Sequence, residues 1–185
     1  PSVAIRSTPA QEPAVAYEDR TSNRILYSEA TDGGGVLSWS GPEVVANDAS
    51  APSLATNGST IAVSFYDEST NSLNYATRSG ASWSYQPVDP ASQTGVESSL
   101  AFTAAGNPVI AYHDAASNRL KIAEWDGSAW QISVVTDSVY SAVAGGTSPD
   151  LAVLPSGNLG VSCLANIGDS GSGEAIYLER TGSTW

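Results

Sequence analysis

The sequence predicts an all-β chain folded as a β-propeller, and three observations lead to this prediction. A segment of the type at Ile61–Ala76, a buried strand followed by a polar turn and a second strand, occurs four times. Equivalent positions in the copies, spaced 48, 47 and 51 residues apart, are Tyr17, Phe65, Tyr112 and Cys163. Turn residues punctuate every copy, and no stretch has a sustained helical period. A four-stranded antiparallel meander repeated every ~40–50 residues is typical of propeller blades.

Each copy is predicted to hold four short strands, of which the first two form a tight hairpin. A turn such as Asn57–Gly58 separates them, because Asn and Gly tolerate the positive φ of hairpin turns. The second strand, as at Ile61–Asp67, is apolar or small throughout, so neighbouring sheets are expected to cover both of its faces. The predicted first strands are Ser2–Ile5, Ser53–Ala55, Ser99–Phe102 and Asp150–Val153.

The third strand of each copy ends near a glycine, and a tryptophan is expected to open the fourth strand. These tryptophans are Trp39, Trp83, Trp130 and Trp185. The chain is therefore expected to be a single array of about four blades, either closed or part of a larger ring. Its predicted repeats are 1–48, 49–95, 96–146 and 147–185. A β-sandwich, the alternative, also uses short strands with regular turns but does not require near-identical repeats.

The composition of the chain restricts the partners it can have. The 185 residues include 19 Asp and Glu against 7 Lys and Arg, which gives a net charge of −12. This charge repels nucleic acid and anionic lipid, so neither is expected as a partner. No apolar run reaches the length of a membrane span, so no membrane insertion is expected. The chain starts at Pro1 and contains no Met, which predicts a processed chain or one piece of a longer precursor, secreted or at a bacterial cell surface.

The single cysteine, Cys163, excludes an internal disulfide and any metal site built from several cysteines. It takes the repeat position that aromatic residues hold in the other three copies. We therefore expect a buried core thiol rather than a reactive one.

Carboxylates recur at one repeat position, at Asp19, Asp67 and Asp114, and an asparagine follows each of them four residues later. Asp and Asn side chains accept backbone N–H bonds in turns, so we expect them to stabilise the turns. The alternative is a ring of carboxylates that holds Ca²⁺ through oxygen ligands. The fourth copy has Ala165 at this position, which breaks such a ring, so no cofactor and no metal is predicted.

The long, variable segments of the chain indicate a functional face. Successive turns of a meander alternate between the two ends of a sheet, so the turns between second and third strands share one end with the linkers between repeats. Elaborated loops on a rigid scaffold commonly carry binding residues. The candidate ligand-binding residues on this face are Asp19, Tyr66, Asp67, His113, Asp114, Tyr140 and Asp169.

No catalytic residue is predicted. His113 is the only histidine, and other copies have Tyr66 and Glu18 at its position, so a Ser/His/Asp or Cys/His apparatus is not expected. Catalysis by a pair of carboxylates stays open, because their separation in space decides whether it can occur.

The repeat itself resembles those of uncharacterised bacterial β-propeller proteins. The resemblance covers nearly the whole chain and is carried by Pro52–Ala55, Asn57–Gly58, Ile61–Asp67, Leu73–Ala76 and Gly80–Trp83. It implies an exported binding or scaffold module with no shared reaction.

Two turns, Gly80–Trp83 and Gly182–Trp185, look like the end of the Asp-box of sialidase-like propellers. Arg78 and Arg180 stand where the box has its Asp. Because the Asp-box is structural, this similarity implies a topology and not an activity.

The function expected from these observations is non-catalytic recognition of a protein or carbohydrate outside the cell, on the face with the elaborated loops. A carboxylate-dependent glycoside hydrolase or lyase is one alternative, and a structural subunit of a surface assembly is another. The fourth repeat reaches Trp185 after three strands. An open sheet edge invites pairing, so we expect a second copy or the remainder of a precursor to associate near Ile176–Leu178 and Trp185.

Overall fold

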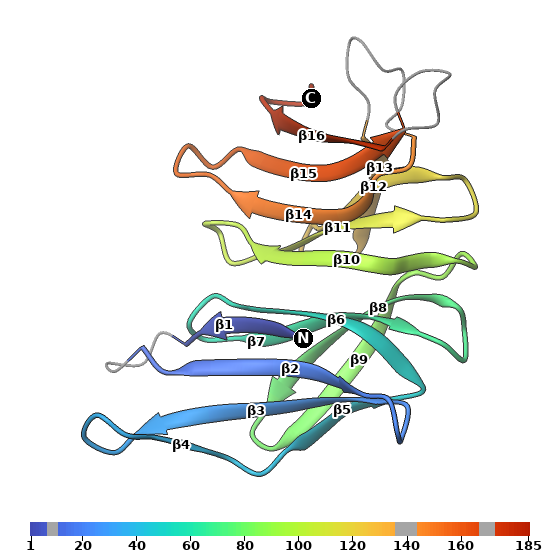
Figure 1. Ribbon diagram of the computed structural model, residues 1–185. Coiled ribbons are helices and arrows are strands. Elements are labelled where there is room, and N and C mark those ends of the chain that lie inside the picture. Colours follow the sequence, from blue (N-terminus) through green and yellow to red (C-terminus); the bar gives the residue numbers. More distant parts are fainter. Residues whose placement is uncertain (7–10, 136–143, 167–172) are drawn as a thin grey trace.

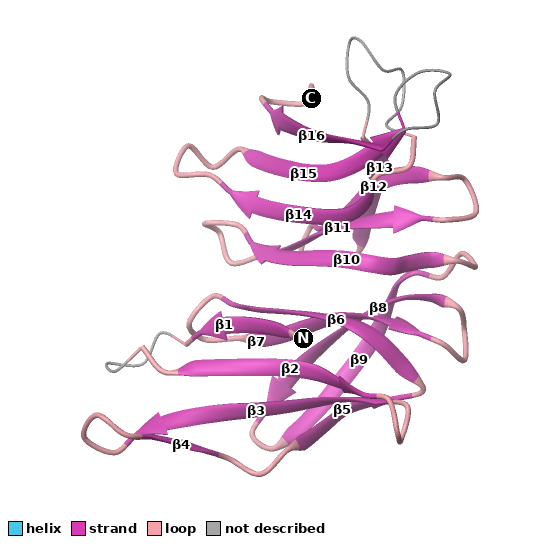
Figure 2. Ribbon diagram, viewed as in Figure 1, coloured by secondary structure: helices cyan, strands magenta, loops and turns pink. Residues whose placement is uncertain are grey.

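The computed structural model describes residues 1–6, 11–135, 144–166 and 173–185. Within these ranges the chain consists of strands and turns and contains no helix (Figure 2). The first sheet contains β1 (Ser2–Ile5), β2 (Pro13–Asp19), β3 (Arg24–Asp32), β4 (Leu37–Trp39) and β5 (Glu43–Asn47). The second contains β6 (Ala49–Thr56), β7 (Ile61–Asp67), β8 (Ser72–Ser79) and β9 (Ser82–Asp89). The third contains β10 (Thr94–Phe102), β11 (Pro108–Asp114), β12 (Arg119–Trp125) and β13 (Trp130–Val134), and the fourth contains β14 (Thr147–Val153), β15 (Leu159–Asn166) and β16 (Gly173–Arg180).

Each sheet is antiparallel, and strands adjacent in sequence are hydrogen-bonded neighbours except β4 and β5, which both pair with β3. The four sheets are stacked one after another in chain order, and the first and fourth lie at opposite ends of the stack (Figure 1). The predicted all-β propeller architecture is therefore confirmed. The described residues contribute no apolar helix that could span a membrane.

The fourth strand of the first sheet departs from the prediction. Trp39 was expected to open this strand, but it is the last residue of β4, and a second piece, β5, pairs with the other half of β3. Pro42 lies between the two pieces and lacks the N–H that a continuous ladder would require. Trp185 also departs from the prediction, because it lies outside any strand, after a turn closed by Thr181 and Thr184. Only β9 and β13 follow the expectation, with Trp83 second in β9 and Trp130 first in β13.

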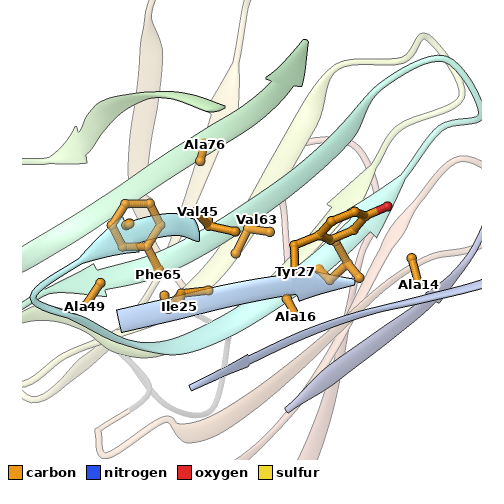
Figure 3. Packing of buried hydrophobic residues seen from close by; sticks show 11 residues of the cluster. Ala14, Ala16, Ile25, Tyr27, Val45, Ala49, Val63, Phe65 and Ala76 are labelled. Carbon is orange, nitrogen blue, oxygen red and sulfur yellow. The ribbon is translucent and has the colours of Figure 1, made fainter. Parts of the chain in front are cut away.

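The hydrophobic core lies between consecutive sheets rather than at a single centre. Figure 3 shows the cluster between the first and second sheets, where Ile25 and Tyr27 of β3 face Val63 and Phe65 of β7. Equivalent clusters fill the second and third interfaces. Middle strands are covered on both sides, which is why β7 and β11 read as apolar or small throughout.

The first strands of successive sheets, β1, β6, β10 and β14, are joined to one another by a repeated hydrogen bond. The Oγ of Ser2 accepts the backbone N–H of Leu54 in the next sheet at 2.9 Å. Ser53 accepts from Leu100 and Ser99 accepts from Leu151 in the same way, each at 3.0 Å. A serine hydroxyl at this repeat position thus fixes how the first strands of adjacent sheets are aligned with each other.

Cys163 is buried in the cluster between the third and fourth sheets, as predicted. Burial in this apolar surrounding raises the pKa of its thiol to about 11. The side chain is therefore a core group that stays protonated at neutral pH.

The strands have two distinct ends in every sheet. We call the end with the turns between first and second strands, and between third and fourth strands, the hairpin end. The end with the turns between second and third strands, where the chain also passes from sheet to sheet, is called the linker end. In Figure 1 the β14–β15 turn marks the hairpin end and the β11–β12 turn marks the linker end.

Candidate functional site

The repeated aspartates hold the turns at the linker end. Oδ1 of Asp67 accepts the backbone N–H groups of Ser69 and Thr70, at 2.8 and 3.2 Å. Asp19 and Asp114 accept the equivalent N–H groups in their own sheets. The asparagines that follow have the positive φ that closes such a turn, with φ of 51°, 54° and 54° at Asn23, Asn71 and Asn118. The predicted turn-stabilising role is confirmed.

Tyr66 and His113 support the same turns from one repeat position. The hydroxyl of Tyr66 donates to Oδ1 of Asn71 at 3.0 Å, and Nε2 of His113 lies 3.2 Å from Oδ1 of Asn118. The five described candidates thus lie on three separate sheets and serve local turns, and that they bind a ligand stays a prediction. Among the described residues no group of three or more His, Cys, Asp or Glu side chains could hold a metal ion. Tyr140 and Asp169 lie outside the described residues.

At the hairpin end, charged pairs join the first sheet to the second. The guanidinium of Arg78 donates two hydrogen bonds to the carboxylate of Glu43, at 2.6 and 2.9 Å, and lies 3.3 Å from Glu29. It also sits over the ring of Tyr27, 5.0 Å from the centroid. These hydrogen bonds lower the pKa of Glu43 and raise that of Arg78. We call such an arginine, paired to a glutamate of the preceding sheet, a clamp.

A second clamp joins the third sheet to the fourth. Arg180 donates to both oxygens of Glu124, at 2.6 and 2.8 Å. Its guanidinium lies 5.7 Å from the ring centroid of Trp185, so this arginine too is packed against an aromatic ring. Bidentate pairing of this kind is the strong form of an arginine–carboxylate contact.

The interface between the second and third sheets lacks a clamp. Trp125 occupies the position of Arg78, since Arg78 faces Trp83 across its hairpin and Trp125 faces Trp130 in the same register. The arginine of the other two interfaces is thus replaced by an uncharged aromatic side chain.

The acceptors of the clamp are replaced at this interface as well. Gln86 faces Tyr75 across β8–β9 in the register in which Glu43 faces Tyr27 in the first sheet. Thr77 follows Tyr75 by two residues, which is the position of Glu29 after Tyr27. All three charged positions of the first clamp have therefore become neutral.

A groove opens where the clamp is missing. This cavity of 560 Å³ lies between the second and third sheets, and its walls include Tyr75, Tyr85, Phe102 and Trp125. We call it the aromatic groove. Tyr75 forms part of its buried floor, whereas Tyr85 stands at the rim with 61% of its surface exposed. Concave sites lined by aromatic groups with a few placed polar groups are typical ligand sites.

Stacking fixes the aromatic walls of the groove. Trp130 packs edge-on between the two other rings, with its centroid 5.3 Å from that of Tyr75 and 5.4 Å from that of Trp125. Such edge-to-face pairs are each worth about 0.5–1.5 kcal/mol beyond the area they bury. The rings are thus held in place before any ligand arrives.

The polar side chains of the aromatic groove are hydroxyls and amides. They are Thr60, Thr77, Ser84, Gln86 and Asn107. The described lining contains no charged side chain, although the whole chain carries 26 charged residues at neutral pH, 19 acidic and 7 basic. Burial raises the pKa of Tyr75 to about 12, so its hydroxyl remains a neutral donor.

A buried charged network closes the linker end of the same interface. Asp89 accepts the hydroxyl of Tyr112 at 2.7 Å and lies 3.3 Å from Nζ of Lys121. Lys121 also lies 2.7 Å from Asp114. Burial alone would raise the pKa of Asp114, but hydrogen bonds from Lys121 and Ser117 outweigh it and hold that pKa at about 2. Charged groups therefore tie the second and third sheets at the linker end, whereas the aromatic groove lies between them at the hairpin end.

Sequence reasoning placed the binding face at the linker end and did not find the aromatic groove, which lies at the hairpin end. The available signal was the loss of a pattern. Arg78 and Arg180 were visible as basic residues beside the Gly–x–x–Trp turns, and Trp125 breaks that series. Recognising the break requires knowing that the two arginines reach across to a neighbouring sheet.

No protein-family model matches the sequence, and no curated protein matches it either. Solved structures do resemble it in fold. The Aleuria aurantia lectin in complex with Fucα1-6GlcNAc has a TM-score of 0.60 at 12% identity, over 94% of this chain and 55% of the lectin. The Penicillium chrysogenum α-L-arabinanase complexed with arabinobiose gives 0.59 at 12% identity, over 93% and 61%. The NanB sialidase of Streptococcus pneumoniae gives 0.55 at 17% identity, over 96% and 30%.

This chain therefore spans between about a third and three fifths of the length of these three structures. Identities this low show a shared fold alone. The predicted distant relationship to sialidase-like propellers is supported at the level of architecture.

Proposed function

We propose that this chain is a non-catalytic carbohydrate-binding module that recognises a neutral sugar in the aromatic groove. The observation that carries the proposal is the replacement of a complete clamp. Arg78, Glu29 and Glu43 close the first interface, whereas Trp125, Thr77 and Gln86 leave the second open. The exchange replaces a charged bridge between two sheets by an open cavity with uncharged aromatic, hydroxyl and amide groups in its described lining.

The chemistry of the lining suits a sugar. A pyranose or furanose ring presents a face of C–H groups and a rim of hydroxyls. Aromatic rings such as Trp125 and Tyr85 offer apolar surface for the face, and Thr77, Ser84 and Gln86 offer donors and acceptors for the rim. The fixed positions of Tyr75 and Trp125 reduce the entropy that binding would cost.

The neutral lining also indicates which ligands are disfavoured. An anionic sugar would find no Arg or Lys in the described lining and would face a protein with a net charge of −12. Hydrolysis by two carboxylates is less favoured than recognition, because the described lining has no Asp or Glu. Two structures of similar fold were solved with saccharides bound, which supports the same class of ligand.

The experiment is a glycan array followed by titration calorimetry of the neutral sugars that bind. Trp125→Ala is expected to weaken binding at least tenfold. The triple variant Thr77→Glu, Gln86→Glu, Trp125→Arg rebuilds the clamp and is expected to abolish binding while the unfolding temperature is retained.

Trp39→Ala is the matched control, because Trp39 is an exposed tryptophan of the first sheet, away from the groove. It should bind as the wild type does. Undiminished binding by the rebuilt clamp, or preferred binding of sialylated or sulfated glycans, would contradict the proposal.

We further propose that the module acts outside the cell and associates with a second copy. The outer faces of the two end sheets support association. Tyr177 and Val3 are 59% and 64% exposed, whereas their repeat equivalents Tyr75 and Leu54, which face neighbouring sheets, are 6% and 5% exposed. Sedimentation of the untagged chain at micromolar concentration tests this, and a stable monomer would count against it.

A further inference from the structure

A second hollow lies beside the aromatic groove at the hairpin end. This hollow of 470 Å³ is lined by the turn residues Asn57, Ser59, Thr103 and Ala105, and we call it the turn hollow. Phe102 and Gly106 line both cavities, so the two are adjacent. Together the two cavities extend from β9 to the β6–β7 and β10–β11 turns.

The junction between the two cavities is built from two turns that touch. Nδ2 of Asn57 donates to the backbone carbonyl of Gly106 at 3.3 Å, which bridges the second and third sheets. Gly106 has a φ of +82°, and a Cβ there would approach Nδ2 of Asn57 to 3.4 Å. The positive φ at this position of the turn therefore favours glycine.

Both turns are held rigid by their own hydrogen bonds. Oδ1 of Asn57 accepts the backbone N–H groups of Ser59 and Thr60, at 3.1 and 2.8 Å. Oγ1 of Thr103 accepts the N–H of Asn107 at 3.2 Å. Oγ1 of Thr103 keeps a further lone pair after this bond and can still accept from a ligand, whereas Oδ1 of Asn57 is already occupied by Ser59 and Thr60. The turn hollow is thus a preformed polar surface without a charged side chain in its described lining.

We infer that the ligand is an extended neutral oligosaccharide that lies along both cavities, and not a single terminal sugar. One sugar ring fills only part of either cavity, and each cavity alone is within the range of about 300–1,000 Å³ of small-ligand sites. The stacking surface around Trp125 anchors one sugar, and the turn hollow receives sugars further along the chain. This inference rests on the proposed function, because it extends the same site.

The test is titration calorimetry with linear β-1,4-linked oligosaccharides of glucose, mannose and xylose, each from one to six residues long. For the sugar that binds, affinity is expected to rise at least tenfold between one residue and four and then to level off. Ala105→Arg should remove that rise and leave the affinity for the shortest binding sugar unchanged, because Ala105 is exposed and lines only the turn hollow.

Ser156→Arg is the matched control, since Ser156 is the equivalent exposed turn residue of the fourth sheet. It should behave as the wild type at every length. Equal affinity for monosaccharide and tetrasaccharide, or an unchanged length dependence in Ala105→Arg, would overturn the extended ligand while the proposed function stands. Absence of binding to any sugar, at any length and on the array, would instead defeat the proposed function itself.

Discussion

Arg78 and Trp125 occupy the same place in consecutive repeats, yet one closes an interface and the other opens one. Each lies at or next to the end of the third strand of its sheet, opposite a tryptophan, and each faces the preceding sheet. Arg78 meets Glu43 and Glu29 there, whereas Trp125 meets Thr77 and Gln86 across a groove. The difference between a structural contact and a candidate binding site is thus confined to a few side chains on a common framework.

Removal of the first clamp should destabilise the fold. Arg78→Ala leaves the partly buried carboxylate of Glu43 without its arginine and removes one of the two arginines that pair with Glu29, and the expected loss in the free energy of unfolding is about 1–3 kcal/mol. Urea denaturation of the two proteins measures it. Arg20→Ala is the control, because the Arg20 side chain is mostly exposed and its pair with Glu18 should contribute under ~1 kcal/mol. Equal effects of the two substitutions would show that the clamp contributes no more to the free energy of unfolding than an exposed ion pair does.

Opening the first interface should create a second binding site. The triple variant Glu29→Thr, Glu43→Gln, Arg78→Trp copies the neutral set of the aromatic groove onto the first interface. We expect calorimetry with the sugar bound by the wild type to change from one site per chain to two. A folded variant that still binds one sugar per chain would mean that other differences between the interfaces decide binding.

The Asp114 network should make stability depend on pH in the acid range. The folded pKa of Asp114, about 2, lies below the unfolded value of about 3.9. Its contribution is therefore fully present above pH 4 and is lost as the pH falls from about 4 to 2. With allowance for solvent screening this amounts to about 1–2 kcal/mol.

Asp114→Asn tests this dependence by urea denaturation at pH 7 and across pH 4 to 2. The variant should be less stable at pH 7 and should lose less stability over the acid window. Asp150→Asn, at an exposed aspartate, serves as the control. Parallel acid curves for wild type and Asp114→Asn would refute the expectation.

The thiol of Cys163 should react slowly. It is buried and its pKa is raised to about 11, so little thiolate is present or accessible at pH 8. Labelling by a thiol reagent is expected to be limited by unfolding, and to become fast in urea. The double variant Ser162→Cys, Cys163→Ala places the thiol one residue away on the exposed side of β15 and should label at once.

The architecture was readable from the sequence because it depends on local and repeated features. Turn residues such as Asn57 and Gly106, and the uninterrupted apolar run of Ile61–Asp67, specify strands and turns within one repeat. The division of the fourth strand around Pro42 was missed because the Gly–x–x–Trp spacing outweighed the proline in that reading.

The candidate site was not readable, because its parts come from two repeats. Trp125 acquires its role only when packed across from Thr77 and Gln86, and nothing within its own repeat shows that pairing. The aspartates recur because they stabilise the same turn in the first three sheets, and their recurrence does not mark a ligand site. Departure from the repeat, at Trp125, was the more informative signal.

The missing clamp has a consequence for how the molecule opens. Asp89, Tyr112 and Lys121 hold the second and third sheets together at the linker end, and at the hairpin end a hydrogen bond from Asn57 to Gly106 joins the two turns. On heating, the second and third sheets should therefore separate first at the hairpin end. Amide hydrogens of β8 and β12 near the groove are expected to exchange before those at the linker end. A sugar bound to both Thr77 and Trp125 would hold the two sheets together reversibly. Slower hydrogen exchange in β8 and β12 would then report the fraction of protein with sugar bound.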